Sequence, residues 1–358
     1  MKRNIRKKSV CIIGHFGFGE NLLNGQTVKT KIVTKELKQQ LGKDEVMTID
    51  THGGSKKLLK LLFQLPHIMK KVENIIIMPA HNGIRFFAPL LAFFNNFFHI
   101  KLHYVVIGGW LPEFLESRKE LQNSLKKFNG IYVETNTMKN NLEKLGFKNV
   151  YILPNCKELN ILKEDELIYA TSKPFKLCTF SRVMKEKGIE DAVNAVEEIN
   201  KQYGETIFTL DIYGQVDPSQ VEWFENLKKK FSSNIKYKGI VPFDQSTNVL
   251  KEYYALLFPT NFYTEGIPGT IIDAYASGVP VIASKWESYD DLIDNKVGYG
   301  YSFGNYNELV AILYKIVKNP KEIEKMKKNC ILEAKKYLPQ VALLKLINSL
   351  KKNEENGL

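Results

Sequence analysis

Basic side chains and a glycine occur together in the segment Ser181–Gly188, which could bind a phosphorylated ligand. An apolar, strand-like run precedes this segment and a helix-like stretch follows it. In open α/β sheets, ligands bind at the carboxyl ends of strands, where the N–H groups at the start of the next helix attract an anion. Arg182 and Lys187 could therefore converge on one diphosphate. A solvated charged loop explains this segment equally well.

A second loop of this kind joins Glu265 to Asp273, which lies eight positions further along the chain. Gly266 and Gly269 lack side chains, so backbone N–H groups could approach a phosphate or sugar oxygen closely, and Pro268 suits a first helical turn. A mostly helical spacer would separate the two carboxylates by about 12 Å. That is roughly the span from a sugar ring across a pyrophosphate to a ribose. Judged by spacing alone, a surface glutamate beside a capped helix is the better interpretation.

An alternation of strand-like and helix-like stretches would position these loops. Short apolar runs predict buried strands, longer amphipathic stretches predict helices between them, and this order argues for parallel sheets covered on both faces. The alternation restarts after the charged, proline-flanked segment Pro154–Pro174, where we place the domain junction. The expected strands are Val10–Gly14, Val46–Asp50, Ile75–Met78, Leu102–Ile107, Ile131–Glu134, Val150–Leu153, Phe175–Phe180, Phe208–Tyr213, Ile235–Lys238, Leu256–Pro259 and Val279–Ala283.

The sequence therefore predicts an α/β protein with two tandem doubly wound, Rossmann-like domains. We place the first domain at residues 1–158 and the second at residues 159–338. A last helix within residues 339–358 is expected to pack back toward the first domain. The length of 358 residues fits two domains.

Charge is distributed unevenly between the two halves. The whole chain has a net charge of +12, of which residues 1–158 contribute +13 and residues 159–358 contribute −1. A basic first half indicates an anionic partner, such as a membrane surface, a phosphorylated substrate or a nucleic acid. Four scattered cysteines without a CxxC motif argue against a disulfide framework or a zinc site and favour a cytoplasmic protein. No secretory signal and no transmembrane helix is expected.

The motifs of the second half follow one another in a recognisable order. They are Ser181-Arg182, Lys187-Gly188, Tyr213-Gly214, Phe258-Pro259, Glu265 with Asp273, and the segment Ser277–Ala283. Over residues 176–302 this order resembles the nucleotide-binding half of the retaining glycosyltransferases of family 4 (glycosyl transferases group 1), which include enzymes of bacterial surface polysaccharides. These enzymes have the GT-B fold, in which two domains face each other across a cleft. Members usually have Glu at both ends of the spacer, whereas this chain has the shorter Asp273 at the second.

The resemblance implies a role for each of these residues. Arg182 and Lys187 would bind the donor diphosphate and stabilise it as a leaving group, since charge develops there as the glycosidic bond breaks. Glu265 would contact the donor sugar and Asp273 the ribose. The reaction would retain the anomeric configuration and need neither a metal nor a cofactor, and the sequence has no DxD motif. The other donor-binding residues would be Gly25, Gly266, Ile267, Pro268, Gly269 and Thr270.

The first half carries weaker signals. The segment Gly14–Gly25 lies where the family has a glycine-rich loop near the donor phosphates, with Asn24-Gly25-Gln26 in place of the commoner Gly-Gly pair. The GxG motif that begins at Gly17 lacks the third glycine of a dinucleotide fingerprint. His81 lies where related enzymes have a catalytic histidine near the donor or acceptor sugar, although a lone histidine is more often structural.

Three further features of the first half have bland interpretations beside functional ones. Lys29 could simply be solvated, and Asn155 could simply shape the interdomain turn. The segment Phe86–Phe98 predicts a core helix, or an interfacial helix with Arg85 and Lys101 at its ends.

These features lead to a hypothesis of function. We expect a hexosyltransferase that uses a UDP-sugar, with GDP-mannose as second choice, and an acceptor that is a glycan or a lipid-linked sugar. The setting would be capsule, exopolysaccharide or O-antigen assembly in the cytoplasm, with peripheral contact to an anionic membrane through the basic half and no nucleic acid partner. The alternatives are a basic nucleic-acid-binding protein and a nucleotide-sugar epimerase of similar architecture. An oxidoreductase is less favoured, because the glycine fingerprint is broken.

Overall fold

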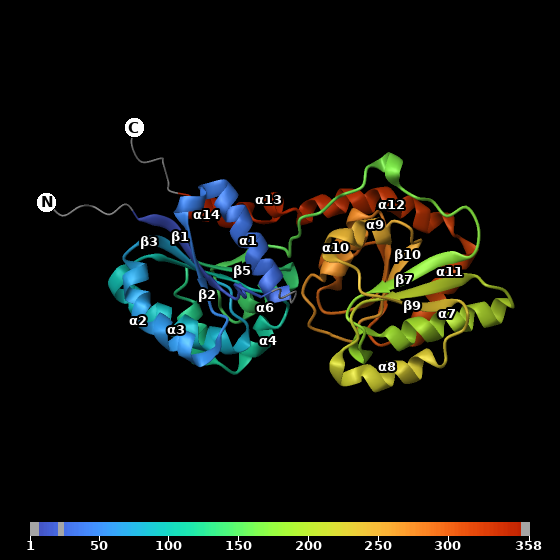
Figure 1. The fold of residues 1–358 in the computed structure, drawn as a ribbon, viewed down its shortest axis with the longest axis horizontal. Coiled ribbons are helices and arrows are strands. Elements are labelled where there is room, and N and C mark those ends of the chain that lie inside the picture. Colours follow the sequence, from blue (N-terminus) through green and yellow to red (C-terminus); the bar gives the residue numbers. More distant parts are fainter. Residues whose placement is uncertain (1–6, 21–24, 352–358) are drawn as a thin grey trace. The chain divides into compact units, whose positions relative to one another are not determined.

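The computed structural model describes residues 7–20 and 25–351, except for the side chains of residues 54–60 and Phe243. Its contacts divide the chain into two compact units (Figure 1). Unit 1 comprises Met1–Glu158 and Leu338–Leu358, and unit 2 comprises Leu159–Tyr337. Among the described residues, no helix combines the length and apolar character needed to cross a membrane.

Unit 1 is built on a six-stranded sheet in the order β2-β1-β3-β4-β5-β6, and all of its strand pairs are parallel. Its strands are β1 (Lys8–Gly14), β2 (Val46–Asp50), β3 (Val72–Ile77), β4 (Lys101–Val105), β5 (Gly130–Val133) and β6 (Val150–Ile152). After β1 the chain adds β2 on one side, and after β3 it adds β4, β5 and β6 on the other side, so the direction of strand order reverses between β1 and β3. That boundary is the topological switch point of this sheet.

Alternating side chains of each strand bury the two faces of this sheet under different helices. Cys11 and Ile13 of β1 belong to the core covered by α2, α3 and α4–α6, while Val10 and Ile12 belong to the core covered by α1 and α14. The helices of unit 1 are α1 (Gly25–Leu41), α2 (Gly54–Met69), α3 (His81–Phe98), α4 (Leu111–Glu116), α5 (Lys119–Leu125), α6 (Asn136–Lys144), α13 (Pro339–Ala342) and α14 (Leu344–Leu350).

Unit 2 repeats the design with the order β12-β11-β10-β7-β8-β9, again entirely parallel. The strands are β7 (Phe175–Phe180), β8 (Phe208–Tyr213), β9 (Ile235–Gly239), β10 (Ala255–Phe258), β11 (Val281–Lys285) and β12 (Gly298–Ser302). The helices are α7 (Ile189–Tyr203), α8 (Val221–Lys228), α9 (Ser246–Leu250), α10 (Gly269–Ala276), α11 (Tyr306–Lys318) and α12 (Lys321–Ala334). The switch point of unit 2 lies between β7 and β10.

Two parallel sheets with helices on both faces confirm the predicted fold class, and each predicted strand is present within a few residues. The sequence interpretation missed β12, which is short and rich in glycine and tyrosine, and the short helices α4 and α5.

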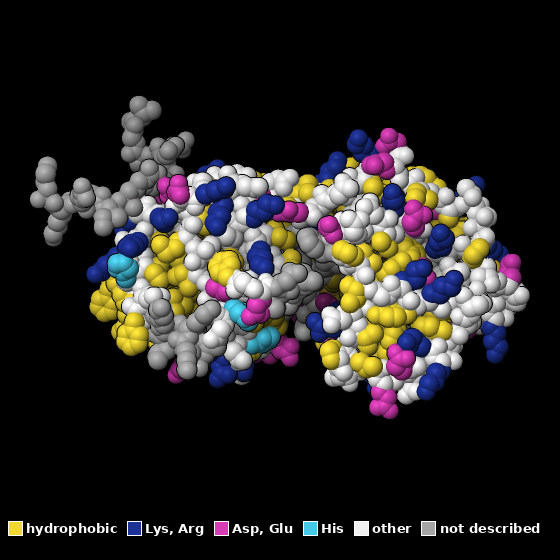
Figure 2. Space-filling view, viewed as in Figure 1, with side chains coloured by type: hydrophobic (Ala, Val, Ile, Leu, Met, Phe, Trp, Pro, Cys, Tyr) yellow, Lys and Arg dark blue, Asp and Glu magenta, His cyan; other side chains and the backbone are white. Residues whose placement is uncertain are grey.

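The segment Phe86–Phe98 lies in α3. The buried side chains of α3 include Phe87 and Leu91, whereas Phe93 and Phe97 are exposed, so neither a core helix nor an interfacial helix describes the segment fully. On the face of unit 1 seen in Figure 2, Lys and Arg side chains are widely spread.

Candidate functional site

The loops that follow β7, β8 and β10 pack closely together at the switch point of unit 2. Gly188 has a φ of +66°, and a Cβ there would lie 1.8 Å from the Pro259 carbonyl oxygen. Gly214 has a φ of +133°, and a Cβ there would lie 1.8 Å from the Ser181 carbonyl oxygen. Only glycine permits both the left-handed backbone and this approach. These glycines therefore let the loop 181–188 lie against its neighbours at the carboxyl end of the sheet.

Lys187 and Glu265 meet in this place. The Lys187 ammonium forms an ion pair with Oε1 of Glu265, and each side chain is 17% exposed. The ammonium also lies 4.9 Å from the centre of the Phe262 ring, a cation–π contact. The Asn261 N–H donates to the Glu186 carbonyl and holds the two loops together. The structure thus brings two of the predicted catalytic residues into direct contact, one from the loop after β7 and one from the loop after β10.

Arg182 has a different partner. Its Nη1 lies 3.5 Å from Oδ2 of Asp217, and 61% of the side chain is exposed. Asp217 follows β8, and its carboxylate accepts hydrogen bonds from the Ser219 hydroxyl and N–H, which with the Arg182 charge lower the pKa of the carboxyl below its usual value. Asp217 therefore stays ionised at neutral pH and pairs with the exposed guanidinium of Arg182. Sequence analysis had not singled out Asp217.

The predicted donor-binding segment 266–270 connects Glu265 to α10. Gly266 and Ile267 are buried, and Pro268 caps α10 in an extended conformation rather than standing in its first turn, so the helix begins one residue later than predicted. The Thr270 hydroxyl is buried and has no hydrogen-bond partner among the described residues. A buried polar atom without a partner is unusual and favours a missing ligand or water. Asp273 is buried in the body of α10.

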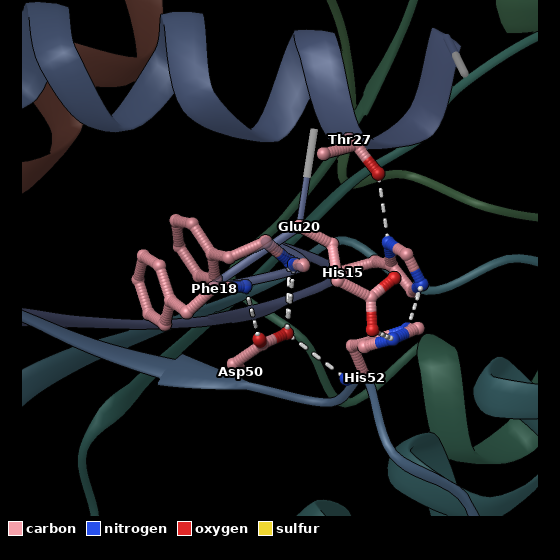
Figure 3. A network of polar contacts seen from close by, with 8 residues as sticks. His15, Phe18, Glu20, Thr27, Asp50 and His52 are labelled. Carbon is pink, nitrogen blue, oxygen red and sulfur yellow. Dashed lines mark hydrogen bonds and ion pairs between the residues drawn. The ribbon is translucent and has the colours of Figure 1, made fainter. Parts of the chain in front are cut away.

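A separate polar network in unit 1 joins the loops after β1 and β2 to the start of α1 and is drawn in Figure 3. Asp50 ends β2, and its carboxylate accepts hydrogen bonds from the N–H groups of Phe16, Phe18 and His52, each at 2.9 Å, and of Gly17 at 3.3 Å. Partial burial raises the pKa of this carboxyl, but the four N–H donors outweigh that effect and lower it below its usual value. Asp50 thereby fixes the start of the glycine-rich loop.

Two histidines extend this network. Nδ1 of His15 lies 2.8 Å from the Thr27 hydroxyl, Nε2 of His15 lies 3.0 Å from Nδ1 of His52, and Nε2 of His52 lies 3.0 Å from Oε1 of Glu20 (Figure 3). Four side chains, from α1 and from the loops that follow β1 and β2, thus form one continuous chain of hydrogen bonds. The sequence signal was present, since polar residues directly after parallel strands gather at one edge of the sheet, but it was not used.

His81 begins α3 and lies at the end of β3. Its ring stacks on Trp110 with centroids 3.8 Å apart and meets Phe114 edge-on at 5.2 Å. Partial burial and the nearby Arg118 charge lower the pKa of His81 below its usual value, so the imidazole is neutral at pH 7. It lines a hollow of about 290 Å³ together with Gln26, Thr51, Pro79, Ala80, Asn82, Gly83 and Phe87.

The structure contradicts the bland interpretation of Lys29 as a solvated side chain. Only 2% of the Lys29 side chain is exposed, and its ammonium lies 2.5 Å from Oε1 of Glu134 and 3.2 Å from the Val106 carbonyl oxygen. Oε1 of Glu134 also accepts the Gly108 N–H at 3.2 Å. Lys29 therefore couples α1 to the loops after β4 and β5. Asn155 accepts the N–H of Cys156, as a turn-shaping residue does.

The predicted residues divide between the two units. Arg182, Lys187, Glu265, Gly266–Thr270 and Asp273 belong to unit 2, whereas Gly25 and His81 belong to unit 1. Gly25 is the exposed first residue of α1, and Asn24 lies outside the described residues. Within the described residues, no group of three or more His, Cys, Asp or Glu side chains is arranged to hold a metal ion.

Comparison with known families supports the resemblance seen in unit 2. Residues 163–336, just under half of the chain, match the family model of glycosyl transferases group 1. The amylovoran biosynthesis glycosyltransferase AmsK of Erwinia amylovora is 26% identical over 157 residues, which are 41% of this chain and 37% of that protein. The GtfA subunit of the UDP-N-acetylglucosamine–peptide N-acetylglucosaminyltransferase of Streptococcus agalactiae is 34% identical over 133 residues, 37% of this chain and 24% of that protein. The matched part is thus less than half the length of these curated relatives.

Solved structures extend the similarity to the whole fold. Anabaena HepE in complex with UDP and glucose matches with a TM-score of 0.70 at 13% identity, covering 96% of this chain and 99% of that one. The lipopolysaccharide outer core galactosyltransferase WaaB matches with a TM-score of 0.71 at 15% identity, covering 95% and 98%. The chain therefore has the GT-B fold, and its match to glycosyl transferases group 1 over residues 163–336 supports a glycosyltransferase.

Proposed function

We propose that this protein is a retaining hexosyltransferase that moves a hexose from a nucleotide diphosphate sugar to a hydroxyl group of a glycan or a lipid-linked sugar. We favour a UDP-sugar as donor, with GDP-mannose as second choice, and bacterial capsule, exopolysaccharide or O-antigen biosynthesis as the setting. The observation that carries the proposal is the contact between Lys187 and Glu265 at the switch point of unit 2. A cation suited to a diphosphate and a carboxylate suited to sugar hydroxyls lie side by side there.

The relatives add support for the donor and the setting. HepE was crystallised with UDP and glucose, the name of the GtfA enzyme specifies UDP-N-acetylglucosamine, and the name of AmsK specifies amylovoran biosynthesis. Each of these statements concerns the relative. They favour a UDP-sugar for this chain because the matched segment includes the loops that carry Arg182, Lys187 and Glu265.

The chemistry that we assign to unit 2 is stabilisation of a leaving group. As the bond between the sugar C1 and the diphosphate oxygen breaks, that oxygen gains negative charge, and fixed positive charge nearby lowers the barrier. Lys187 and Arg182 would supply this charge, helped by the N–H groups at the start of α10. The arriving diphosphate would draw Lys187 away from Glu265, and the released carboxylate would accept hydrogen bonds from sugar hydroxyls.

Metal independence and the fate of the acceptor proton belong to the same proposal. Two cationic side chains would offset the diphosphate charge that a divalent ion offsets in other enzymes. The acceptor oxygen would form the new bond to C1 on the face that the diphosphate leaves, and the departing phosphate oxygen would take the acceptor proton. In this scheme no protein carboxylate acts as a base.

We assign acceptor binding to unit 1. The lining of the hollow beside His81 includes the amide groups of Gln26 and Asn82, the hydroxyl of Thr51 and the imidazole of His81, which suit the hydroxyls of a sugar. The neutral imidazole of His81 can both donate to and accept from such hydroxyls.

Hydrolysis of nucleotide sugars by the purified chain tests the proposal, because slow donor hydrolysis requires no acceptor. We expect release of UDP from at least one UDP-sugar in the presence of EDTA, and a sugar product with the anomeric configuration of the donor. UDP at a hundred times its dissociation constant should stabilise the fold by about 2.7 kcal/mol, seen as a raised melting temperature.

Matched variants make this test specific. Arg182→Ala should reduce the thermal shift with UDP, while Lys236→Ala, which removes an exposed lysine at the edge of the same sheet, should leave it unchanged. If neither UDP nor GDP shifts the melting temperature and no nucleotide sugar is hydrolysed, the assignment fails. An isomerised donor without acceptor would instead indicate an epimerase.

A further inference from the structure

The outer side of α3 carries a stripe of basic and apolar residues. Arg85, Pro89, Phe93 and Phe97 recur every fourth position and are all exposed, and Phe93 and Phe97 are 58% and 68% exposed. Their rings contact each other edge-on with centroids 5.8 Å apart. The side chains that bury α3 against the sheet, among them Phe87, lie on the other side of the helix. Two large aromatic rings thus project from a helix that is already anchored elsewhere.

The neighbouring helix α2 adds a third ring. Phe63 is 81% exposed, whereas Leu61 and Leu65, two residues away on either side, are buried. These leucines share one core cluster with Phe87 and other buried residues of α3, so α2 and α3 cover the same face of the unit 1 sheet. Figure 2 shows hydrophobic side chains gathered at the end of unit 1 where Figure 1 places α2. We call the outer side of these two helices, with Phe63, Phe93 and Phe97, the α2–α3 face.

A basic hollow adjoins the α2–α3 face. It measures about 460 Å³ and is lined by Arg85, Pro89, Ser117, Arg118, Lys119, Glu120 and Leu121. Nη1 of Arg118 donates to the Phe114 carbonyl at 2.5 Å, and its guanidinium lies 3.9 Å from the centre of the Phe114 ring, so this cation is held in place. Among the described residues, Arg85 and Lys119 have no ion-pair partner, and Glu120 is the sole acid of the lining. The hollow therefore suits an anion such as a phosphate group.

The charge of the surrounding chain has the same sign. Between Thr51 and Trp110 the sequence contains one acidic residue, Glu73, and seven basic residues: Lys56, Lys57, Lys60, Lys70, Lys71, Arg85 and Lys101. Two copies of such a face would repel each other if they met. An apolar face in a strongly basic surround is complementary to a surface that is negatively charged outside and apolar beneath.

We propose that the α2–α3 face binds the surface of a bilayer that contains anionic phospholipids. Phe63, Phe93 and Phe97 enter the boundary between headgroups and acyl chains, and the hollow beside Arg85 and Lys119 receives a headgroup phosphate. The chain lies on the membrane through this face and is not anchored by it permanently. This mode of binding involves no residue that we assign to the sugar donor.

Sedimentation with vesicles tests this proposal on the full chain. We expect the protein to pellet with vesicles of equal parts phosphatidylglycerol and phosphatidylcholine and to remain in the supernatant with phosphatidylcholine alone. Phe93→Ser with Phe97→Ser should weaken binding to the anionic vesicles on the order of tenfold. Arg85→Ala with Lys119→Ala should remove most of the preference for phosphatidylglycerol. The matched control, Val221→Ser with Leu332→Ser, removes exposed apolar side chains from unit 2 and should bind as the original protein does.

Three further measurements distinguish the outcomes. A UDP-induced thermal shift that survives in the Phe variant shows that the chain is folded, and vesicle binding is scored whether or not UDP binds. Inorganic phosphate at the concentration of the lipid should leave binding intact; release of the protein would identify free phosphate as the ligand of the hollow and overturn the membrane assignment. Light scattering that finds a dimer, made monomeric by the Phe variant while vesicle binding is unchanged, would assign the face to a second copy and equally overturn the proposal.

Discussion

The Lys187 ammonium is paired with the Glu265 carboxylate across 78 positions of sequence, and this pair joins the two loops that border the switch point of unit 2. Neither charge is fully hydrated, since each side chain is 17% exposed. Each residue is therefore the nearest compensating charge of the other. A ligand that brings negative charge to this pair competes with Glu265 for Lys187, so the pair links donor binding to the orientation of the carboxylate.

Substitutions of Lys187, Glu265 and Arg182 should change UDP binding and turnover in different ways. Lys187→Ala and Arg182→Ala each remove a charged hydrogen bond, so we expect UDP to bind more weakly by about 1.5–3 kcal/mol. Glu265→Gln removes the competitor for Lys187, and UDP should bind more tightly while donor hydrolysis falls. Glu265→Ala should abolish transfer in a folded protein. Calorimetry with UDP and hydrolysis assays measure both effects. Normal turnover in all of these variants would show that the site lies elsewhere.

The unpartnered hydroxyl of Thr270 gives a second prediction. Thr270→Val replaces a buried polar atom that has no partner among the described residues with a methyl group of the same shape. The free energy of unfolding should stay the same or rise by up to about 1 kcal/mol, while UDP-sugar affinity falls by about 0.5–1.5 kcal/mol, the worth of a neutral hydrogen bond. Thr270→Ser, which keeps the hydroxyl, is the control for affinity. Destabilisation with unchanged affinity would contradict a role in ligand binding.

Much of the fold could be predicted because parallel sheets leave a strong pattern. Strands such as β1, β3 and β10 are buried on both faces and appear in the sequence as continuous apolar runs. The short helix α4, in contrast, contains proline and has too few residues to show a helical period, and β12 alternates glycine with tyrosine. Such elements are fixed by packing against the rest of their unit, which a local pattern does not reveal.

The candidate site could be predicted only in part, for a related reason. Residue type and order pointed to Lys187 and Glu265, but their contact depends on how the loops after β7 and β10 pack, which Gly188 and Pro259 determine through a close approach. Asp217 was missed because its role depends on reaching Arg182 from a different loop. The burial of Lys29 could not be predicted, because a lysine in an amphipathic helix is usually solvated and the sequence around it does not indicate Glu134 as its partner.

The buried pair of Lys29 and Glu134 leads to a prediction about stability. Lys29→Met should lower the free energy of unfolding of unit 1 by about 3–5 kcal/mol, because it leaves a buried carboxylate without its cation. Lys35→Met is a matched control in the same helix, since Lys35 pairs with Glu158 at 2.6 Å with both side chains more than half exposed. Its effect should be within about 1 kcal/mol. Chemical denaturation followed by a probe in unit 1 measures the difference, and equal effects of the two substitutions would contradict the buried pair.

The hydrogen bonds of Asp50 should make the glycine-rich loop sensitive to acid. Partial burial raises the pKa of this carboxyl, but the hydrogen bonds from the N–H groups of His52, Phe18, Phe16 and Gly17 lower it by a larger amount. Its folded-state pKa therefore lies below the value of about 3.9 in an unfolded chain. A carboxylate of this kind stabilises the folded loop fully above about pH 4, and the contribution is lost as the pH falls through the folded-state pKa. Asp50→Asn should therefore weaken the loop at neutral pH, and the difference from the original protein should shrink below about pH 4.

Amide hydrogen exchange measures this effect at the bonded groups themselves. In Asp50→Asn the N–H groups of Phe16 and Phe18 should exchange faster than in the original protein at pH 7, because a neutral amide oxygen is a weaker acceptor than a carboxylate. The N–H of Thr51, which donates to the Gly14 carbonyl rather than to Asp50, serves as the internal control and should keep its protection. Unchanged protection at Phe16 and Phe18, or a difference that grows on acidification, would show that the carboxylate does not hold this loop.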